Sequence, residues 1–253
     1  MNTYSTKNIR NVVLLGSSKS GKTTLAEALM YEGKVIDRRG TVEGKNTISD
    51  NTEVEQINQR SIYATPLYAE FMDNKLNIID TPGVDDFVGG VISAFKVCDS
   101  GVMLINATQG VDVGTEIFGR YAEDYHKPLI LGVNQLDNDK ANWDGTLDSL
   151  HQAFGSKPVV LQFPTATGSA FNGFIDILKM KQYIFKDENG TREEKEIPAE
   201  FAGQAEDMKA ALMEMAAEND EALMEKFFAD GTLSEDDVNK GLKIGFMKGE
   251  IYP

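Results

Sequence analysis

Short apolar runs alternate with helix-like segments along the first 154 of the 253 residues. The runs are apolar at consecutive positions, a pattern typical of strands that are buried on both faces of a sheet. We predict strands at residues 9–15, 62–71, 75–80, 101–106 and 128–133, and helices at residues 25–32, 88–97, 113–125 and 142–154. This alternation predicts an α/β fold whose mostly parallel sheet has helices on both faces.

The pattern changes after Gly155, where two strand-like segments are followed by three helical ones. The predicted strands are residues 158–163 and 174–185, followed by a turn signal at residues 187–190. The predicted helices begin at Pro198, near Asp220 and at Ser234. In the first helix, apolar side chains recur at three- and four-residue steps: Phe201, Ala205, Met208, Leu212 and Met215. We interpret the methionines as core residues rather than a recognition surface.

The change in pattern after Gly155 predicts the domain organisation. Residues 1–157 form a core, residues 158–249 an inserted α+β subdomain, and residues 250–253 the start of a strand that returns to the core. We therefore expect the natural chain to continue beyond Pro253. Between Val35 and about Gln59 the chain is polar and has no clean periodicity, which predicts a functional or disordered loop.

A glycine-rich loop, GSSKSGKTT, separates the first predicted strand from the first predicted helix. Its glycines and the Lys22-Thr23 pair have phosphate-loop spacing, so backbone N–H groups and the helix N-terminus can hold a triphosphate. Lys22 would reach the terminal phosphates and the Thr23 hydroxyl would bind magnesium. A simple glycine-rich turn is the alternative. The expected contacts are Gly16, Ser17, Ser18, Lys19, Ser20, Gly21, Lys22, Thr23 and Thr24.

Asp80-Thr81-Pro82-Gly83 follows the predicted strand at residues 75–80. Asp80 can hold magnesium through a water molecule, and the N–H of Gly83 can contact the third phosphate. A strand-to-helix turn is the alternative interpretation. Ligands of such sheets lie beyond the carboxyl ends of the strands, where this motif and the phosphate loop both fall.

Asn134-Gln135-Leu136-Asp137 follows the strand predicted at residues 128–133. A carboxylate at Asp137 can accept two hydrogen bonds from guanine, whereas adenine offers no such pair of donors. An ordinary turn is again the alternative. Three motifs at one edge of the sheet predict guanine nucleotide binding, with GTP or GDP and Mg²⁺ as ligands.

The composition limits the partners and the compartment. A net charge of −15 argues against broad binding to nucleic acid or to an anionic membrane, so we expect neither DNA nor a membrane as partner. The single cysteine, Cys98, cannot form an intramolecular disulfide and suits a reducing compartment. No signal-like or membrane-length apolar segment is evident in the sequence. We predict a cytoplasmic monomer.

The segments GSSKSGKTTLAEAL, DTPGVDDFVGGV and VNQLD resemble the GTPase domain of translation elongation factor G, most closely its divergent bacterial relatives. Residues 158–249 resemble the insertion that this family carries. The resemblance implies a Ras-like P-loop NTPase fold and a ribosome-associated GTPase of translocation or recycling. It also implies ribosomal RNA and the ribosomal stalk protein as partners. Arg38 and Arg39 would approach the RNA, or are solvated loop charges.

The resemblance also implies magnesium ligands: Thr23, Asp80 and a hydroxyl from the first mobile loop. Register places Ser61 at that last position, although the family's preceding arginine-glycine pair is absent here. The acidic helices near residues 206–225 would dock the stalk protein, or form a solvated face. Gly168-Ser169-Ala170 matches the family's guanine-contacting segment, but we interpret that match as coincidental and expect the true segment beyond Pro253.

Two departures from the family pattern bear on activity. Val84 replaces the histidine that orients the attacking water, so only Lys22 and Gly83 remain of the expected catalytic groups, and losing such a group costs ~10²–10⁴ in rate. Gln135 replaces a lysine, which predicts weaker nucleotide binding. We expect a slow or atypical GTPase, with a nucleotide-binding switch of little or no hydrolysis as the alternative. A P-loop kinase would leave the second and third motifs unexplained.

Overall fold

The computed structural model describes residues 3–187 and 190–253, which form two compact units, Met1–Asn134 and Gln135–Pro253. Each unit has its own sheet and its own buried core. The turn predicted at residues 187–190 includes positions 188 and 189, which lie outside the described residues. The predicted boundaries at residues 157 and 249 stay a prediction.

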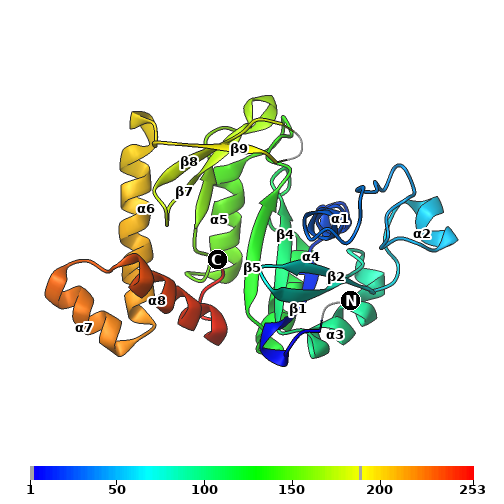
Figure 1. Ribbon diagram of the computed structural model, residues 1–253, viewed down its shortest axis with the longest axis horizontal. Helices are drawn as coiled ribbons and strands as arrows, with labels where there is room; N and C mark the ends of the chain where they lie inside the picture. Colours follow the sequence, from blue (N-terminus) through cyan, green and yellow to red (C-terminus); the bar gives the residue numbers. More distant parts are fainter. Residues whose placement is uncertain (1–2, 188–189) are drawn as a thin grey trace. The chain divides into compact units, whose positions relative to one another are not determined.

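In the described part of the first unit, five strands form one sheet in the order β2-β3-β1-β4-β5 (Figure 1). They are β1 (Ile9–Leu15), β2 (Thr65–Phe71), β3 (Asn74–Asp80), β4 (Ser100–Asn106) and β5 (Leu129–Asn134). All neighbours are parallel except β2 and β3, which form a hairpin. The turn of this hairpin places Met72 and Asp73 at φ 46° and 58°. The mostly parallel sheet confirms the predicted fold class.

The helices of this unit are α1 (Lys22–Glu32), α2 (Glu53–Asn58), α3 (Val88–Val97) and α4 (Val113–Asp124). Leu14 of β1 and Ile78 of β3 are buried with Ala26 and Met30 of α1 in one apolar cluster. Val13 and Leu15 are also fully buried, and successive strand residues point to opposite faces of a sheet. The continuous apolar run of β1 therefore reflects burial on both of its faces, as the sequence pattern predicts.

The first loop, residues 34–64, is more structured than the sequence pattern indicates. It contains α2, which begins at a capping box. The Thr52 hydroxyl accepts a hydrogen bond from the Glu55 N–H, and the Glu55 carboxylate accepts one from the Thr52 N–H. The helix has only six residues, too few for a helical period to stand out. The predicted strand at residues 62–71 correspondingly begins later, at Thr65.

The second unit combines an antiparallel sheet with four helices, within the residues that the structure describes (Figure 1). The sheet has the order β6-β7-β8-β9, formed by β6 (Gln162–Pro164), β7 (Gly173–Asp176), β8 (Lys181–Phe185) and β9 (Arg192–Lys195). The helices are α5 (Trp143–Phe154), α6 (Ala199–Glu218), α7 (Glu221–Asp230) and α8 (Glu235–Lys248). The single strand predicted at residues 174–185 is two strands, because the chain turns at Met180, where φ is 52°.

The core of the second unit lies between this sheet and the helices. Ile175 and Ile177 are fully buried with Leu212 and Ala216 of α6 and Val238 of α8. Methionines pack against this core, as predicted: Met208, Met213, Met215 and Met224. The chain end returns beside residues 157–159, where the N–H of Tyr252 donates to Lys157 and the N–H of Val159 donates to Tyr252.

None of the helices in residues 3–187 and 190–253 combines the length and apolar character needed to cross a bilayer.

Candidate site at the carboxyl ends of the first sheet

The phosphate loop connects the end of β1 to the start of α1, as the motif predicts. Gly16 and Gly21 adopt φ of 129° and 103°, a region that side chains rarely tolerate. A Cβ at Gly16 would lie 2.4 Å from the carbonyl oxygen of Leu104, so no larger residue fits there. Gly21 precedes α1 without a side-chain cap, which leaves the N-terminal amides of that helix for another acceptor.

Lys22 lies buried at the base of this loop. Its ammonium donates hydrogen bonds to the carbonyl oxygens of Gly16 and Ser17, both at 2.8 Å. Burial lowers the pKa of Lys22 to about 8, although the carboxylates of Asp80, Asp112 and Asp50 oppose that shift. A buried ammonium that keeps a third donor suits a highly charged anion such as a phosphate chain.

Thr23, Ser61 and Asp80, the predicted magnesium ligands, lie together although they are far apart in the sequence. The Thr23 hydroxyl donates to Asp80 Oδ2 at 2.8 Å and lies 3.2 Å from the Ser61 hydroxyl oxygen. The Ser49 hydroxyl donates to the same Asp80 oxygen at 2.6 Å. Burial raises the pKa of Asp80, and the Ser49 and Thr23 hydroxyls and the Lys22 ammonium oppose the shift.

Asp50 is a further carboxylate at this site that the sequence patterns do not reveal. It is 4% exposed, and among the described residues neither of its carboxylate oxygens has a hydrogen-bond partner. The same holds for Asp80 Oδ1. Burial raises the pKa of Asp50, which the nearby Ser61 hydroxyl opposes only in part.

Buried polar atoms of native proteins normally have partners, and hard divalent cations take oxygen ligands. The Asp50 and Asp80 carboxylates, with the Thr23 and Ser61 hydroxyls, are therefore a donor set that fits a magnesium ion. Asp50 was missed because it lies in the first loop, where nothing in the local pattern distinguishes one acidic residue from another.

Gly83 lies directly against the phosphate loop. A Cβ there would come within 2.4 Å of Lys22 Nζ and 2.6 Å of the Ser18 backbone nitrogen. Thr81 supports this segment by donating its hydroxyl to the carbonyl oxygen of Leu14 at 2.5 Å. Val84 follows with a half-buried side chain that carries no group able to accept a proton.

Asn134 ends β5 and is joined to the phosphate loop, because its amide donates to the carbonyl oxygen of Ser20 at 2.8 Å. Gln135 and Asp137 belong to the second unit, where Gln135 has φ 61°. In that unit the N–H of Gly168 donates to the Leu136 carbonyl oxygen at 2.7 Å, and the N–H of Ser169 donates to Asp139 at 3.1 Å. The Gly168-Ser169-Ala170 segment thus contacts the stretch that contains Asp137.

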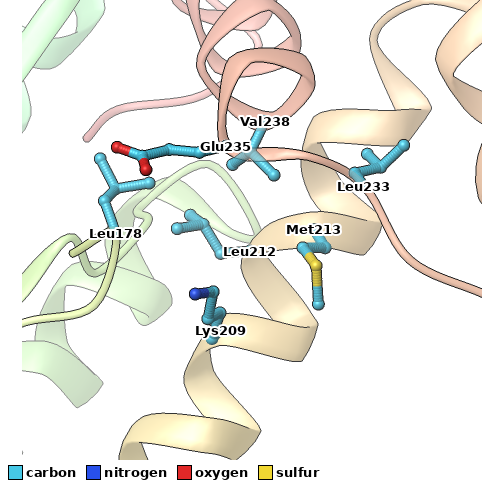
Figure 2. Close-up of a pocket in the computed structure, with 7 residues that line it drawn as sticks. All are labelled: Leu178, Lys209, Leu212, Met213, Leu233, Glu235 and Val238. Carbon is cyan, nitrogen blue, oxygen red and sulfur yellow. The ribbon is translucent and has the colours of Figure 1, made fainter. Parts of the chain in front are cut away.

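Two cavities of the second unit do not suit a nucleotide. One lies between α6 and α8 and is lined by apolar side chains with Lys209 and Glu235 among them (Figure 2). It has a volume of about 60 Å³, less than the ~150 Å³ cavity that holds benzene in an engineered protein. The other is lined by one basic side chain, Lys248, and four acidic ones whose net charge would repel phosphate: Glu218, Asp220, Glu221 and Glu225.

The fold and these sites define a GTP-binding domain of the P-loop class. Residues 7–227 match the family described as the elongation factor Tu GTP binding domain, and the chain belongs to that family. This membership confirms the predicted translation-factor GTPase domain related to elongation factor G.

A crystal structure of a protein from Thermus thermophilus is similar to the chain, with a TM-score of 0.90 and 30% sequence identity. The match covers 97% of this chain and 36% of that protein, so the chain spans about a third of its relative's length.

Proposed function

We propose that the chain is the GTP-binding domain of a ribosome-associated translation factor of the elongation factor G type, acting in translocation or ribosome recycling. Membership of the elongation factor Tu GTP binding domain family supports the translation-factor part of the proposal. The observation that carries the nucleotide site is the Thr23–Asp80–Ser61 cluster beside Lys22 and Gly83. It unites the phosphate loop, the end of β3 and the first loop at one edge of a parallel sheet, where such folds bind ligands.

In this proposal the nucleotide is held by backbone and side-chain groups of the three motifs. The amides of residues 16–24 and the Lys22 ammonium bind the phosphates, and the N–H of Gly83 contacts the third phosphate. Thr81 and Pro82 shape the turn that presents Gly83. Asp137 accepts hydrogen bonds from guanine, with Asn134 bracing the phosphate loop and Gln135 beside the base.

Magnesium would be bound by Thr23 and Ser61, with Asp80 and Asp50 orienting its water molecules. When bound, the ion would neutralise negative charge on the phosphates. Asp50 and Asp80 would in turn gain the partners that their buried oxygens lack among the described residues.

GTP hydrolysis is expected of the family, and we propose that it is slow in this chain. Val84 offers no group to orient or deprotonate water, so Lys22 and Gly83 act only by binding and charge. A GTP-binding switch with little or no hydrolysis is the second candidate, favoured by the same valine. Restoring histidine with Val84→His should raise ribosome-stimulated turnover by about 10²-fold or more. Wild-type turnover as fast as that of the variant would contradict the slow rate proposed here and the second candidate.

The partners proposed are the ribosome and, through the acidic residues of α6 and α7, its stalk protein. Arg38 and Arg39 are exposed in the first loop, and the Arg39 guanidinium lies 5.6 Å from the centre of the Tyr31 ring. We propose that these arginines approach ribosomal RNA, and that the protein acts as a cytoplasmic monomer with a core of residues 1–157 and an insertion at residues 158–249. Charge reversal of Glu206 and Glu225 should weaken ribosome-stimulated activity if the stalk protein docks there.

Competitive binding of GTP, GDP and ATP tests the nucleotide assignment. We expect GTP and GDP to bind with Mg²⁺ and ATP to compete at least about 10²-fold more weakly, because Asp137 would be left unpaired against adenine. The matched variant Asp137→Asn should lose most of this preference while still binding triphosphate. Equal affinities for GTP and ATP in the wild-type protein would refute the assignment.

A further inference from the structure

Asp137, the residue that we assign to guanine, lies in the loop before α5, and a distant turn of the same unit holds this loop on both sides of it. The turn connects β6 to β7. There the N–H of Gly168 donates to the Leu136 carbonyl oxygen at 2.7 Å. The N–H of Ser169 donates to the Asp139 carboxylate at 3.1 Å. One turn therefore holds the residue before Asp137 and the second residue after it.

The turn between β6 and β7 is itself held by the antiparallel sheet of the second unit. The two strands pair with each other immediately before and after the turn. The pairing is extended by the N–H of Thr165, which donates to the Gly173 carbonyl oxygen at 3.2 Å. Inside the turn the N–H of Phe171 donates to the Gly168 carbonyl oxygen at 2.9 Å. A turn that is fixed at both ends can hold a neighbouring loop in one position.

The loop around Asp137 depends on contacts of this kind, because core packing does not position it. Residues 137–140 are all exposed. Gln135 has φ 61°, a conformation that costs energy for a residue with a side chain and persists only where the surrounding structure imposes it. The two hydrogen bonds from the turn tie this exposed stretch to a folded sheet.

The same bonds indicate how the turn acts. Gly168-Ser169-Ala170 has the residue types of a guanine-contacting segment, but the N–H groups of Gly168 and Ser169 already donate to acceptors of the protein. Each backbone N–H is a single donor, so these two groups are not available to a ligand oxygen. Their effect on a nucleotide would therefore pass through the loop that contains Asp137.

We propose that Asp139 is a positioning residue for guanine recognition, and that the turn between β6 and β7 holds the loop so that the Asp137 carboxylate meets the base. A site that discriminates by paired hydrogen bonds depends on such placement, since a displacement of ~1 Å can cost ~10²-fold. The antiparallel sheet of the second unit then contributes to base selectivity through the loop it holds. The inference rests on the proposed assignment of Asp137 to guanine.

Asp139→Ala tests the proposal, because it removes the acceptor of the Ser169 N–H. Affinities are measured by titration with ribose-labelled fluorescent GTP and ATP in the presence of Mg²⁺. We expect the affinity for GTP to fall about tenfold and that for ATP to change less than about twofold, so the preference for guanine falls about tenfold. A general loosening of the site would weaken both nucleotides alike. A GTP-to-ATP affinity ratio within about twofold of the wild-type ratio overturns the proposal.

Three further variants separate position from charge. Asp139→Asn keeps an oxygen acceptor of the same size and should keep the guanine preference within about threefold; a loss as large as that of the alanine variant would contradict positioning. Gly168→Ala strains the turn at φ 71° and should lower the preference in the same direction as Asp139→Ala. Asp148→Ala removes an exposed carboxylate of α5 in the same unit and is the matched control, which should bind like wild type.

A double-mutant cycle with Asp137→Asn distinguishes positioning from a merely structural role. If Asp139 acts through Asp137, Asp139→Ala should change GTP affinity less than about twofold once Asp137 is replaced. A tenfold loss in that background would contradict the proposal.

The wild-type measurements separate this inference from the proposed function. Equal wild-type affinities for GTP and ATP refute the assignment of Asp137 to guanine, and the inference with it. A wild-type preference for GTP that Asp139→Ala retains refutes the inference alone. Circular dichroism establishes that each variant is folded. Should Asp139→Ala fail to fold, Gly168→Ala decides the question by the same affinity ratio.

Discussion

Replacing Gly83 by alanine separates the Asp80-Thr81-Pro82-Gly83 motif from the phosphate loop by a known amount. The new Cβ would lie 2.6 Å from the Ser17 carbonyl carbon and the Ser18 nitrogen, whereas ordinary contact begins at 3.4 Å. The end of Lys22, at 2.4 Å, can swing aside, but the two backbone atoms cannot. One backbone segment must therefore move by about 0.8 Å, the difference between 3.4 and 2.6 Å.

A misplacement of this size is large for a binding site, since ~1 Å can cost ~10²-fold in activity. We expect the affinity for a non-hydrolysable GTP analogue to fall about 10²-fold, equivalent to about 2.8 kcal/mol. The affinity for GDP should fall less, because the N–H of Gly83 is assigned to the third phosphate. Fluorescence titration with both nucleotides, in the presence of Mg²⁺, measures the two losses.

Gly89→Ala is the matched control. No atom lies within 4 Å of a Cβ at that position, which is in helix α3. Nucleotide binding should be unchanged, and stability should rise by up to about 1 kcal/mol because alanine is the better helix former. If Gly83→Ala binds both nucleotides as tightly as Gly89→Ala, the steric reasoning for this site is refuted.

Three further outcomes follow from single contacts. Asn134→Ala removes the hydrogen bond to the Ser20 carbonyl oxygen and should weaken nucleotide binding about tenfold in the same titration. An unchanged affinity would show that this bond does not support the phosphate loop. Burial, and to a smaller extent the charge of Asp99, raises the pKa of the Cys98 thiol to about 11. At pH 8 only about one folded molecule in a thousand therefore has an ionised thiol, whereas roughly a quarter of unfolded chains would. Absorbance assays with a disulfide reagent should therefore show at least about 10²-fold slower reaction in the folded protein, rising about tenfold per pH unit up to pH 11; equal rates before and after unfolding would contradict this. Gly241→Ala would place a Cβ 2.1 Å from the Ala216 carbonyl oxygen, which should lower the stability of the second unit by about 1–3 kcal/mol in calorimetry and leave nucleotide affinity unchanged.

The elements that local pattern predicts are those whose signal lies within a few neighbouring residues. The run of β1 is apolar because both of its faces are covered, and the apolar steps of α6 mark the face that packs on the core. Strand β9 is the counterexample: its four residues, Arg192–Lys195, are all exposed, so hydrophobic pattern gives it no signal. It forms because β8 offers a partner for its backbone.

The same distinction explains the candidate site. The phosphate loop could be located from spacing alone, because its backbone conformation depends on its own glycines. The role of Asp50 could not be predicted from spacing. Its carboxylate is distinguished by being buried without a hydrogen-bond partner near Asp80, which lies 30 positions further along the chain. The same is true of Glu27, whose two carboxylate oxygens contact amides 13 and 21 residues away.

Sequence by itself therefore determined the class of fold, the three motifs and the departures at Val84 and Gln135, since these depend on residue type and short spacing. Tertiary structure alone decided which hydroxyls and carboxylates meet Asp80, and how the first loop is held. The physical reason is that the side chain of a Glu, Ser or Asp is well solvated at any position of an unfolded chain. Only folding can bury its charge or hydroxyl beside a specific distant partner.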